Sequence, residues 1–319
     1  MNLHIPTSAY QGMAAAMLLA SATAAVPKRP PPDMLFLENN SMKIGIDRSM
    51  GASITWLSWQ TQPGNIINIH DPGRLIQQSY YAGKPLDRRN DGQHKAWSPW
   101  TWNPIQGGGV MSWARVTRFE KFDDLKLVSE TIPKLWDMPD EEAEAVMLQA
   151  TEFEPGMPNV VRVHNRIVCR RRTDDRWGAA VPRHQELPAC YFISAFRHVE
   201  SYLGNGEWRR EHQPPGPPWG RANPPLNVMA CFNDDGQGVA IFSPAATEHW
   251  NFGPHRPFTP NAKPEDGPCI HLAPIATIPL GPQSALQYRY WIVVGTKPEI
   301  TKKIDTLLVG HHDETFELR

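Results

Sequence analysis

Hydrophobic and polar residues alternate along most of the chain, which is the pattern of half-buried β-strands. In the segment 160–170, VVRVHNRIVCR, Val161 and Val163 fall on one face, whereas Arg162 and His164 fall on the other. The segment 42–59, MKIGIDRSMGASITWLSW, alternates on both sides of a glycine-containing turn and predicts a β-hairpin. Further runs of the same kind lie at 110–119, 125–132, 146–153, 189–196, 227–232, 238–243 and 285–295.

One late segment has helical periodicity instead. In 298–308, PEITKKIDTLL, Pro298 and Glu299 occupy the expected first turn. The apolar side of this helix is made by Ile300, Ile304, Leu307 and Leu308. Many strands with turn-rich connections and a single late helix predict an all-β fold, a large antiparallel β-sandwich.

The connections indicate one domain with two unusual loops. Segments 204–225 and 251–269 are rich in Pro and Gly and too long for simple turns, and ordered loops of this length are often functional. No internal repeat and no separating linker is visible. We therefore expect a single domain over residues 25–319.

Composition adds two observations. A formal net charge of -1 and a pI near 6.9 provide no global positive field, which argues against nucleic acid as a partner. The 319 residues include 32 Pro, which favours ordered loops over long helices, and 12 Trp. Tryptophan suits core packing, which accounts for most of these residues, and also stacking on the apolar face of a sugar ring.

The N-terminus resembles a secretory signal peptide. An apolar segment at 13–19 is followed by small residues with Ala22, Thr23 and Ala24 in cleavage-site form, although no Lys or Arg precedes it. We expect residues 1–24 to be removed and the mature protein to be secreted or periplasmic. Neither this segment nor any later one has the about 20 apolar residues of a membrane span.

The four cysteines, Cys169, Cys190, Cys231 and Cys269, have neither CxxC nor Cys/His metal spacing. Buried thiols within strands are the favoured interpretation, and up to two disulfides are the alternative in an oxidising compartment. The sequence predicts no metal and no cofactor.

Polar side chains gather in four segments, each with a turn or a predicted strand end. These segments are 68–81, 97–109, 183–188 and 247–255. Catalytic side chains favour strand ends, where the sheet fixes their position and a loop gives access. The candidates are Asn68, His70, Asp71, Arg74, Gln77, Tyr80, Trp97, Trp100, Asn103, Gln106, His184, Gln185, Glu186, Glu248, His249 and Trp250.

Each candidate also has a plain structural explanation. Asp71 before Pro-Gly is a common turn former, and a single Glu at a strand end is usually solvated. The run Gly107 to Gly109 lacks the Lys-Ser/Thr and the following helix of a phosphate loop. The repeated combination of carboxylate, imidazole, amide and indole nevertheless suits a polyhydroxylated ligand.

The hairpin 42–59 and the polar segment after it resemble the start of galactose-mutarotase-like supersandwich domains. The segment 226–250, with an Asp-Asp-Gly-Gln-Gly turn between two strands and a Thr-Glu-His-Trp end, is similar to secreted carbohydrate-active proteins of that kind. That fold is shared by aldose epimerases and by domains of many glycoside hydrolases and polysaccharide lyases. The resemblance covers nearly all of the mature chain. It implies a poly- or oligosaccharide ligand.

Three chemistries follow from that ligand, and glycoside hydrolysis is placed first. It needs two carboxyls, for which Glu186, Glu248 and Asp71 are the candidates. A uronate lyase would instead use His70 or Tyr80 as base and neutralise the substrate acid with Arg74, Gln77 and Asn103. A lectin-like domain would use the tryptophans without reaction. The expected substrate-binding residues are Arg74, Gln77, Trp97, Trp100, Asn103, Gln106, His184, His249 and Trp250.

Overall fold

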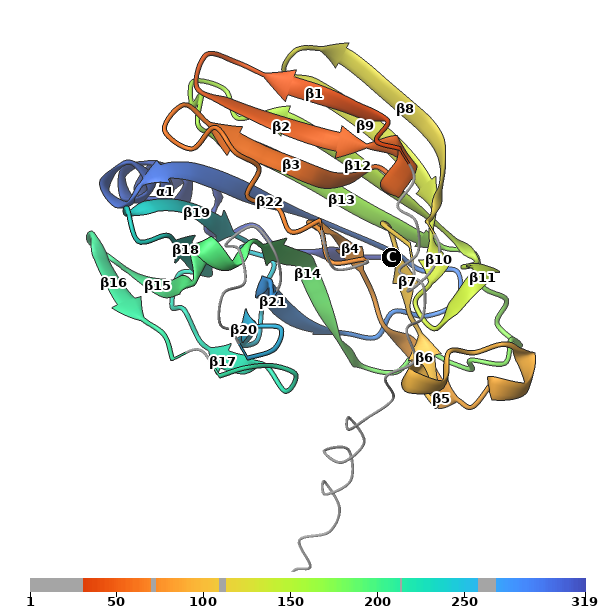
Figure 1. The fold of residues 1–319 in the computed structure, drawn as a ribbon. Helices are drawn as coiled ribbons and strands as arrows, with labels where there is room; N and C mark the ends of the chain where they lie inside the picture. Colours follow the sequence, from red (N-terminus) through yellow and green to blue (C-terminus); the bar gives the residue numbers. More distant parts are fainter. Residues whose placement is uncertain (1–30, 70–72, 109–112, 213, 258–267) are drawn as a thin grey trace, which may run out of the picture.

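Two large antiparallel sheets face each other in the computed structural model, which describes residues 31–69, 73–108, 113–212, 214–257 and 268–319 (Figure 1). The alternation in the sequence explains this arrangement, because each strand has one face to bury. In β13 (Val160–Cys169), Val161 and Val163 enter the core between the sheets, whereas His164 and Arg166 are exposed. The predicted all-β sandwich is confirmed.

The first sheet has eight strands and positions the candidate site. Its order is β11 (Met138–Glu142), β10 (Lys134–Leu135), β7 (Pro104–Ile105), β4 (Gln77–Ser79), β14 (Arg183–Phe192), β21 (Ile270–Ile278), β20 (Trp250–Pro254) and β17 (Gly220–Ala222). One face packs on the core, and the opposite face is called the outer face below.

The second sheet has ten strands. Its order is β16 (Glu207–Arg210), β15 (His198–Gly204), β18 (Val228–Phe232), β19 (Gln237–Phe242), β22 (Ala285–Thr296), β13, β12 (Ala145–Phe153), β9 (Lys126–Ile132) and β8 (Arg115–Asp123), with β23 (Glu317–Leu318) pairing β22. Its central strands are buried on both faces, because α1 covers the side away from the core.

Two smaller sheets complete the fold. The predicted hairpin forms β2 (Met42–Asp47) and β3 (Ser53–Trp59), which join β1 (Met34–Glu38), and β5 (Ala82–Leu86) pairs β6 (Trp100–Trp102). Short 3₁₀ turns occur at Arg48–Met50, Arg89–Asp91, Lys95–Trp97 and Ser194–Phe196.

The predicted helix is confirmed as α1 (Lys297–His311), one turn longer than expected. Thr296 and Glu299 form a capping box at its start, in which the Glu299 carboxylate accepts from the Thr296 backbone N–H at 2.7 Å. Ile300, Ile304 and Leu307 are buried against the ten-stranded sheet. Within the described residues, no helix is long and apolar enough to cross a membrane.

Two boundaries differ from the sequence prediction. The strand expected at 189–196 is β14, which begins at Arg183, so Glu186 lies inside a strand and not before it. The polar residues at its start, Arg183 to Glu186, hid this part of the strand. The strand expected at 110–119 is described from Arg115, and residues 110–112 lie outside the described part.

All four cysteines are buried, and none of them forms a disulfide with another described residue.

Candidate functional site

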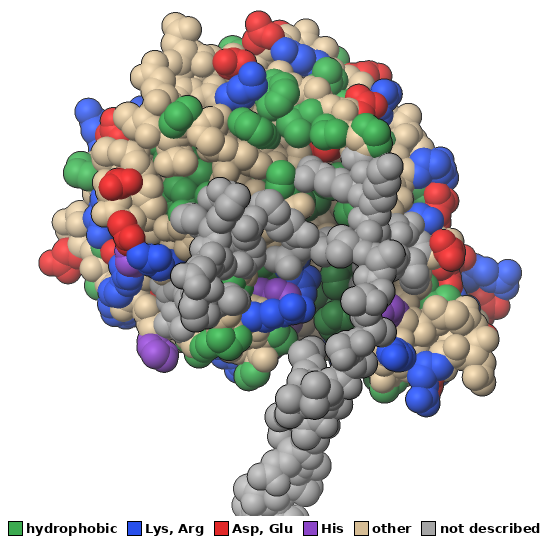
Figure 2. Space-filling model, viewed as in Figure 1, with side chains coloured by type: hydrophobic (Ala, Val, Ile, Leu, Met, Phe, Trp, Pro, Cys, Tyr) green, Lys and Arg blue, Asp and Glu red, His purple; other side chains and the backbone are tan. Residues whose placement is uncertain are grey.

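A cleft of about 680 Å³ opens on the outer face of the eight-stranded sheet, above β4 and β14. Histidine and basic side chains are visible near the middle of this side of the molecule (Figure 2). Aromatic and polar side chains both line the cleft. They include Arg74, Gln77, Tyr81, Trp97, Trp100, Asn103, Trp136, Glu186, Tyr191, Trp219 and His255.

The two-residue period of strand β4 decides which side chains reach the cleft. Gln77 and Ser79 face outward and line it, and Tyr81 continues the same face. Gln78 and Tyr80 face the core and are fully buried. The adjacent tyrosines at 80 and 81 therefore have opposite surroundings.

Arg74 projects from the turn before β4 and is held by aromatic rings. Its guanidinium carbon lies 5.7 Å from the ring centres of both Trp136 and Tyr191. The turn fits closely, because Gly73 has φ of +70° and a Cβ there would lie 2.7 Å from Trp136. An arginine fork held against aromatic faces keeps its orientation.

The hydrogen bonding of Arg74 leaves donors for a ligand. Its Nη2 lies 2.7 Å from His255 Nε2, and because a guanidinium only donates, the imidazole accepts through that nitrogen. The buried Nε has no hydrogen-bond partner, and no described carboxylate forms an ion pair with Arg74. Within the described residues, Arg74 thus keeps hydrogen-bond donors that no carboxylate occupies.

Glu186 and His271 form a contact at the cleft floor. His271 Nδ1 lies 3.2 Å from the Cys190 carbonyl, which can only accept, so Nδ1 carries a proton. The other nitrogen, Nε2, lies 3.4 Å from a Glu186 carboxyl oxygen. His271 Nε2 is buried and has no hydrogen-bond partner among the described residues, so the contact with Glu186 is one of proximity. Glu186 is 8% exposed and His271 is 0% exposed.

The two cleft tyrosines are proton donors. Burial, reinforced by the negative charge of Glu186, raises the pKa of Tyr81 and of Tyr191 well above the usual value. Their hydroxyl groups stay protonated at neutral pH. They can therefore give a proton or a hydrogen bond, but they are poor bases.

The aromatic wall is built from a tryptophan cluster. Trp97 contacts Trp100 and Trp136, with ring centres 5.1 and 5.5 Å apart. Trp100 Nε1 donates to Asn103 Oδ1 at 3.1 Å, and Asn103 Nδ2 donates to the Tyr80 carbonyl at 2.8 Å. The Asn103 amide thus orients the wall and keeps one N–H for a ligand.

Gln77 is anchored in the same way. Its Oε1 accepts from the Gly107 N–H at 2.8 Å, and its Nε2 donates to the Gly73 carbonyl. The second N–H of the amide group is left for the cleft.

Six of the sequence candidates line this one cleft: Arg74, Gln77, Trp97, Trp100, Asn103 and Glu186. His70 and Asp71 lie outside the described residues. Asn68 and Gln185 are buried, and Gln185 bonds the backbone of Tyr81.

The other candidates do not line the cleft. Tyr80, Gln106 and Trp250 are buried on the core side of the sheet. Gln106 donates to the Ala52 carbonyl and to Gln149 Oε1, both at 3.1 Å. Glu248 and His184 are exposed, and His249 is half-buried.

Several cleft residues were missed by sequence reasoning: Tyr81, Trp136, Tyr191, Trp219, His255 and His271. Tyr81 and His255 lie within the polar segments 68–81 and 247–255. The others lie in runs that read as ordinary strand or loop, and only the pairing of strands brings them to Glu186.

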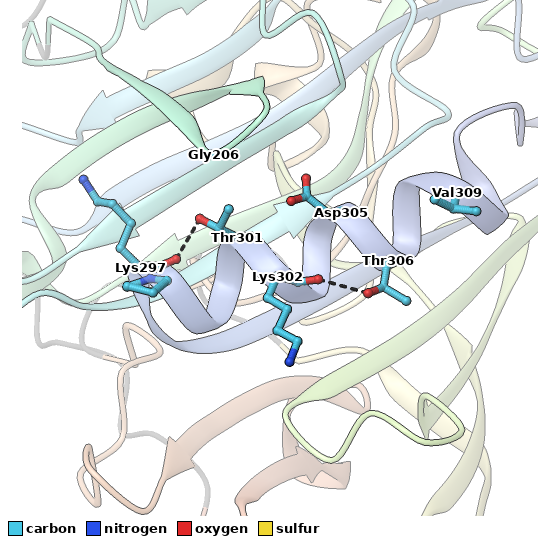
Figure 3. Close-up of a pocket in the computed structure, with 8 residues that line it drawn as sticks. Gly206, Lys297, Thr301, Lys302, Asp305, Thr306 and Val309 are labelled. Atoms are coloured by element: carbon cyan, nitrogen blue, oxygen red, sulfur yellow. Dashed lines mark hydrogen bonds between the residues drawn. The ribbon is translucent and has the colours of Figure 1, made fainter.

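A second hollow, of about 850 Å³, runs along the solvent face of α1 (Figure 3). Several of its polar groups are already engaged. Thr301 and Thr306 donate to helix carbonyls at 2.8 and 3.0 Å, and Lys297 pairs with Glu200 at 2.7 Å. It offers no convergent set of side chains, so the outer-face cleft is the candidate site.

Solved structures of similar arrangement include galactose mutarotase-like proteins. A GalM/aldose epimerase homologue from C. elegans has a TM-score of 0.50 at 6% identity, covering 83% of this chain and 99% of its own. A galactose mutarotase-like protein from Lactobacillus casei ATCC 334 has a TM-score of 0.47 at 12% identity, covering 82% and 100%. A TPR-domain containing protein from Parabacteroides distasonis ATCC 8503 has 0.50 at 8%, covering 83% and 47%.

No protein-family model and no curated protein matches the chain. The structural likeness establishes the galactose mutarotase-like fold that the hairpin resemblance implied. At these identities it concerns the fold alone.

Proposed function

We propose that this protein is a carbohydrate-active enzyme whose cleft binds an acidic saccharide and eliminates across a bond of a uronate unit. The observation that carries the proposal is Arg74, whose guanidinium lies against Trp136 and Tyr191, forms no ion pair with a described carboxylate and has a buried Nε without a hydrogen-bond partner. A guanidinium fork of this kind suits the two oxygens of a carboxylate. The fold of the GalM/aldose epimerase homologue supports a saccharide as ligand at a general level.

The rest of the lining suits the sugar itself. The Trp97 and Trp100 rings supply apolar faces, and the remaining N–H groups of Gln77 and Asn103 supply donors beside Arg74. In the proposed complex, Arg74 and these amides neutralise the uronate carboxylate. The acidity of the neighbouring ring C–H rises as a result.

The proton transfers are then carried out by side chains at the cleft floor. Glu186, backed by His271, takes the proton from the carbon next to the carboxylate, and the C–H electron pair forms a carbon–carbon double bond. The C–O bond to the neighbouring sugar breaks in turn. A protonated tyrosine, Tyr81 or Tyr191, donates its proton to the departing oxygen, consistent with their raised pKa values.

Glycoside hydrolysis by Glu186 and Glu248 has less support from the geometry. That chemistry needs two carboxyls flanking one bond. Glu186 is the only carboxylate among the described lining residues, and Glu248 is exposed outside the cleft.

The test is a panel of uronate-containing and neutral glycans, followed by ultraviolet absorbance and reducing-end assays. Elimination predicts an absorbing unsaturated product only from the uronate glycans. Glu186→Gln should reduce its formation by about two orders of magnitude, because the amide cannot take the proton. Arg74→Lys should raise KM, because Lys keeps the charge but loses the planar fork.

Glu248→Gln separates the two reaction schemes. Elimination as proposed predicts near-normal turnover of this variant, whereas a hydrolytic pair predicts a loss similar to that of Glu186→Gln. Reducing ends without an absorbing product would replace elimination by hydrolysis. Glycan binding with neither product would leave a lectin-like domain.

A further inference from the structure

A row of polar and basic side chains continues from Glu186 across the outer face of the eight-stranded sheet. We define the basic row as His184, Thr277, His249, Asn251 and Arg221. These residues lie on four neighbouring elements, and none of them lines the cleft described above.

Strand register places the row on the same face as Glu186. His184 lies two residues before Glu186 on β14 and pairs with Thr277 of β21, and both are exposed. Asn251 of β20 pairs with Arg221 of β17. Trp250 is buried in the core, so Asn251, its neighbour on β20, points to the opposite, outer side. His249 precedes this strand, and its ring contacts that of exposed His184.

The row begins directly beside the proposed reaction centre. Glu186 pairs with Ile275 of β21, and the Ile275 carbonyl accepts from the Glu248 N–H at 3.0 Å, just before His249. The rings of His184 and His249 then meet edge to face, with centres 5.4 Å apart. From β14 to β17 the face spans three strand spacings, about 14 Å, which is longer than one sugar ring.

Arg221 carries the positive charge of the row. Arg221 is exposed and forms no ion pair with a described carboxylate. His249 Nε2 is buried without a hydrogen-bond partner. Burial, and then the charges of Arg221 and His184, lower the pKa of His249, whereas Asn251 and Glu248 act weakly in the opposite direction. Glu248, the residue before His249, is exposed.

We propose that the basic row is a second subsite, which binds an acidic group on a neighbouring unit of the same saccharide chain. This inference rests on the proposed function and deepens it, because it makes the substrate a polyanionic oligo- or polysaccharide. The Arg221 guanidinium would pair with the acidic group of the saccharide, and His249 Nε2 and the Asn251 amide would form hydrogen bonds to it. A chain that extends from Glu186 toward β17 reaches these groups only if it is longer than one or two units.

The experiment measures binding and turnover with oligogalacturonates of graded length, with neutral cello-oligosaccharides as a comparison. The variants are Arg221→Ala and the double variant His184→Ala/His249→Ala. The matched control is Lys302→Ala, which removes a surface charge from the solvent face of α1, behind the other sheet (Figure 3). Binding is measured in the Glu186→Gln background, so that the ligand is not consumed.

For long oligogalacturonates, we expect each row variant to weaken binding by about tenfold, as for loss of a charged hydrogen bond. The shortest substrates and the Lys302→Ala protein should show no change. Equal losses for short and long ligands, or no loss for either, would overturn the second subsite while leaving the proposed function intact. If the wild-type protein binds no acidic oligosaccharide of any length, both proposals fail together.

Discussion

At the scale of single residues, Tyr80 and Tyr81 show how one strand divides its side chains between stability and chemistry. The Tyr80 hydroxyl donates to Gln78 Oε1 at 3.0 Å inside the core. Tyr81 lines the cleft beside Glu186. A sequence motif that contains both residues cannot say which one reaches a ligand.

We expect Tyr80→Phe to destabilise the protein by about 1–3 kcal/mol, because it leaves the buried Gln78 oxygen without a donor. Tyr81→Phe should leave stability nearly unchanged and reduce turnover or binding. Urea denaturation and the glycan assay measure the two effects separately. A larger loss of turnover in Tyr80→Phe at full stability would contradict this division.

The cysteines are a second prediction at this scale. Burial raises the pKa of the Cys169 thiol to about 11, and it raises those of Cys190 and Cys231 well above their usual value. Thiols with raised pKa values stay protonated and unreactive at neutral pH. A thiol reagent should therefore label none of the four cysteines in the native protein and all four in concentrated urea. Rapid labelling of the native protein would show that the thiols are accessible.

At the scale of elements, the start of α1 depends on its capping box. Thr296 Oγ bonds the Glu299 carboxylate at 2.8 Å, and the same carboxylate accepts from the Thr296 N–H. Thr296→Ala should cost about 1 kcal/mol of unfolding free energy. Lys302→Ala, on the solvent face of the same helix, serves as the control and should change little. Equal effects of the two substitutions in thermal unfolding would argue against the cap.

The short strand β4 is held by a network of buried amide side chains. Gln106 Oε1 accepts from the Gln78 N–H, and its Nε2 donates to Gln149 Oε1, both at 3.1 Å. These bonds fix β4 against the opposite sheet, and Gln77 on its other face is fixed with it. Gln106, a sequence candidate for ligand binding, thus supports the cleft from behind.

At the scale of the whole molecule, secretion is the prediction to test. The segment 1–24 lies outside the described residues, and the signal-peptide interpretation rests on its apolar run and the Ala22–Ala24 site. Expression with export should yield a mature protein that begins near Ala25. Mass spectrometry measures this directly, and an exported chain that retains Met1 would contradict it.

The alternation of apolar and polar residues by itself determined the fold class, the hairpin β2–β3 and the helix α1. These features depend on local periodicity and capping, which a linear sequence displays. It also pointed to six of the cleft residues, because polar side chains beside strands are visible without knowledge of their partners. Glu186 and Arg74 belong to that group.

The tertiary structure alone decided which polar clusters meet. Glu186 contacts His271 and Arg74 contacts His255 only because β14, β21 and the segments around them come together from distant parts of the chain. The tertiary structure likewise decided which side of the sheet each side chain faces: Tyr81 faces the cleft, and Tyr80, Gln106 and Trp250 face the core. A shift of one residue reverses a side chain's direction, and that phase is set by pairing with neighbouring strands, which sequence spacing does not encode.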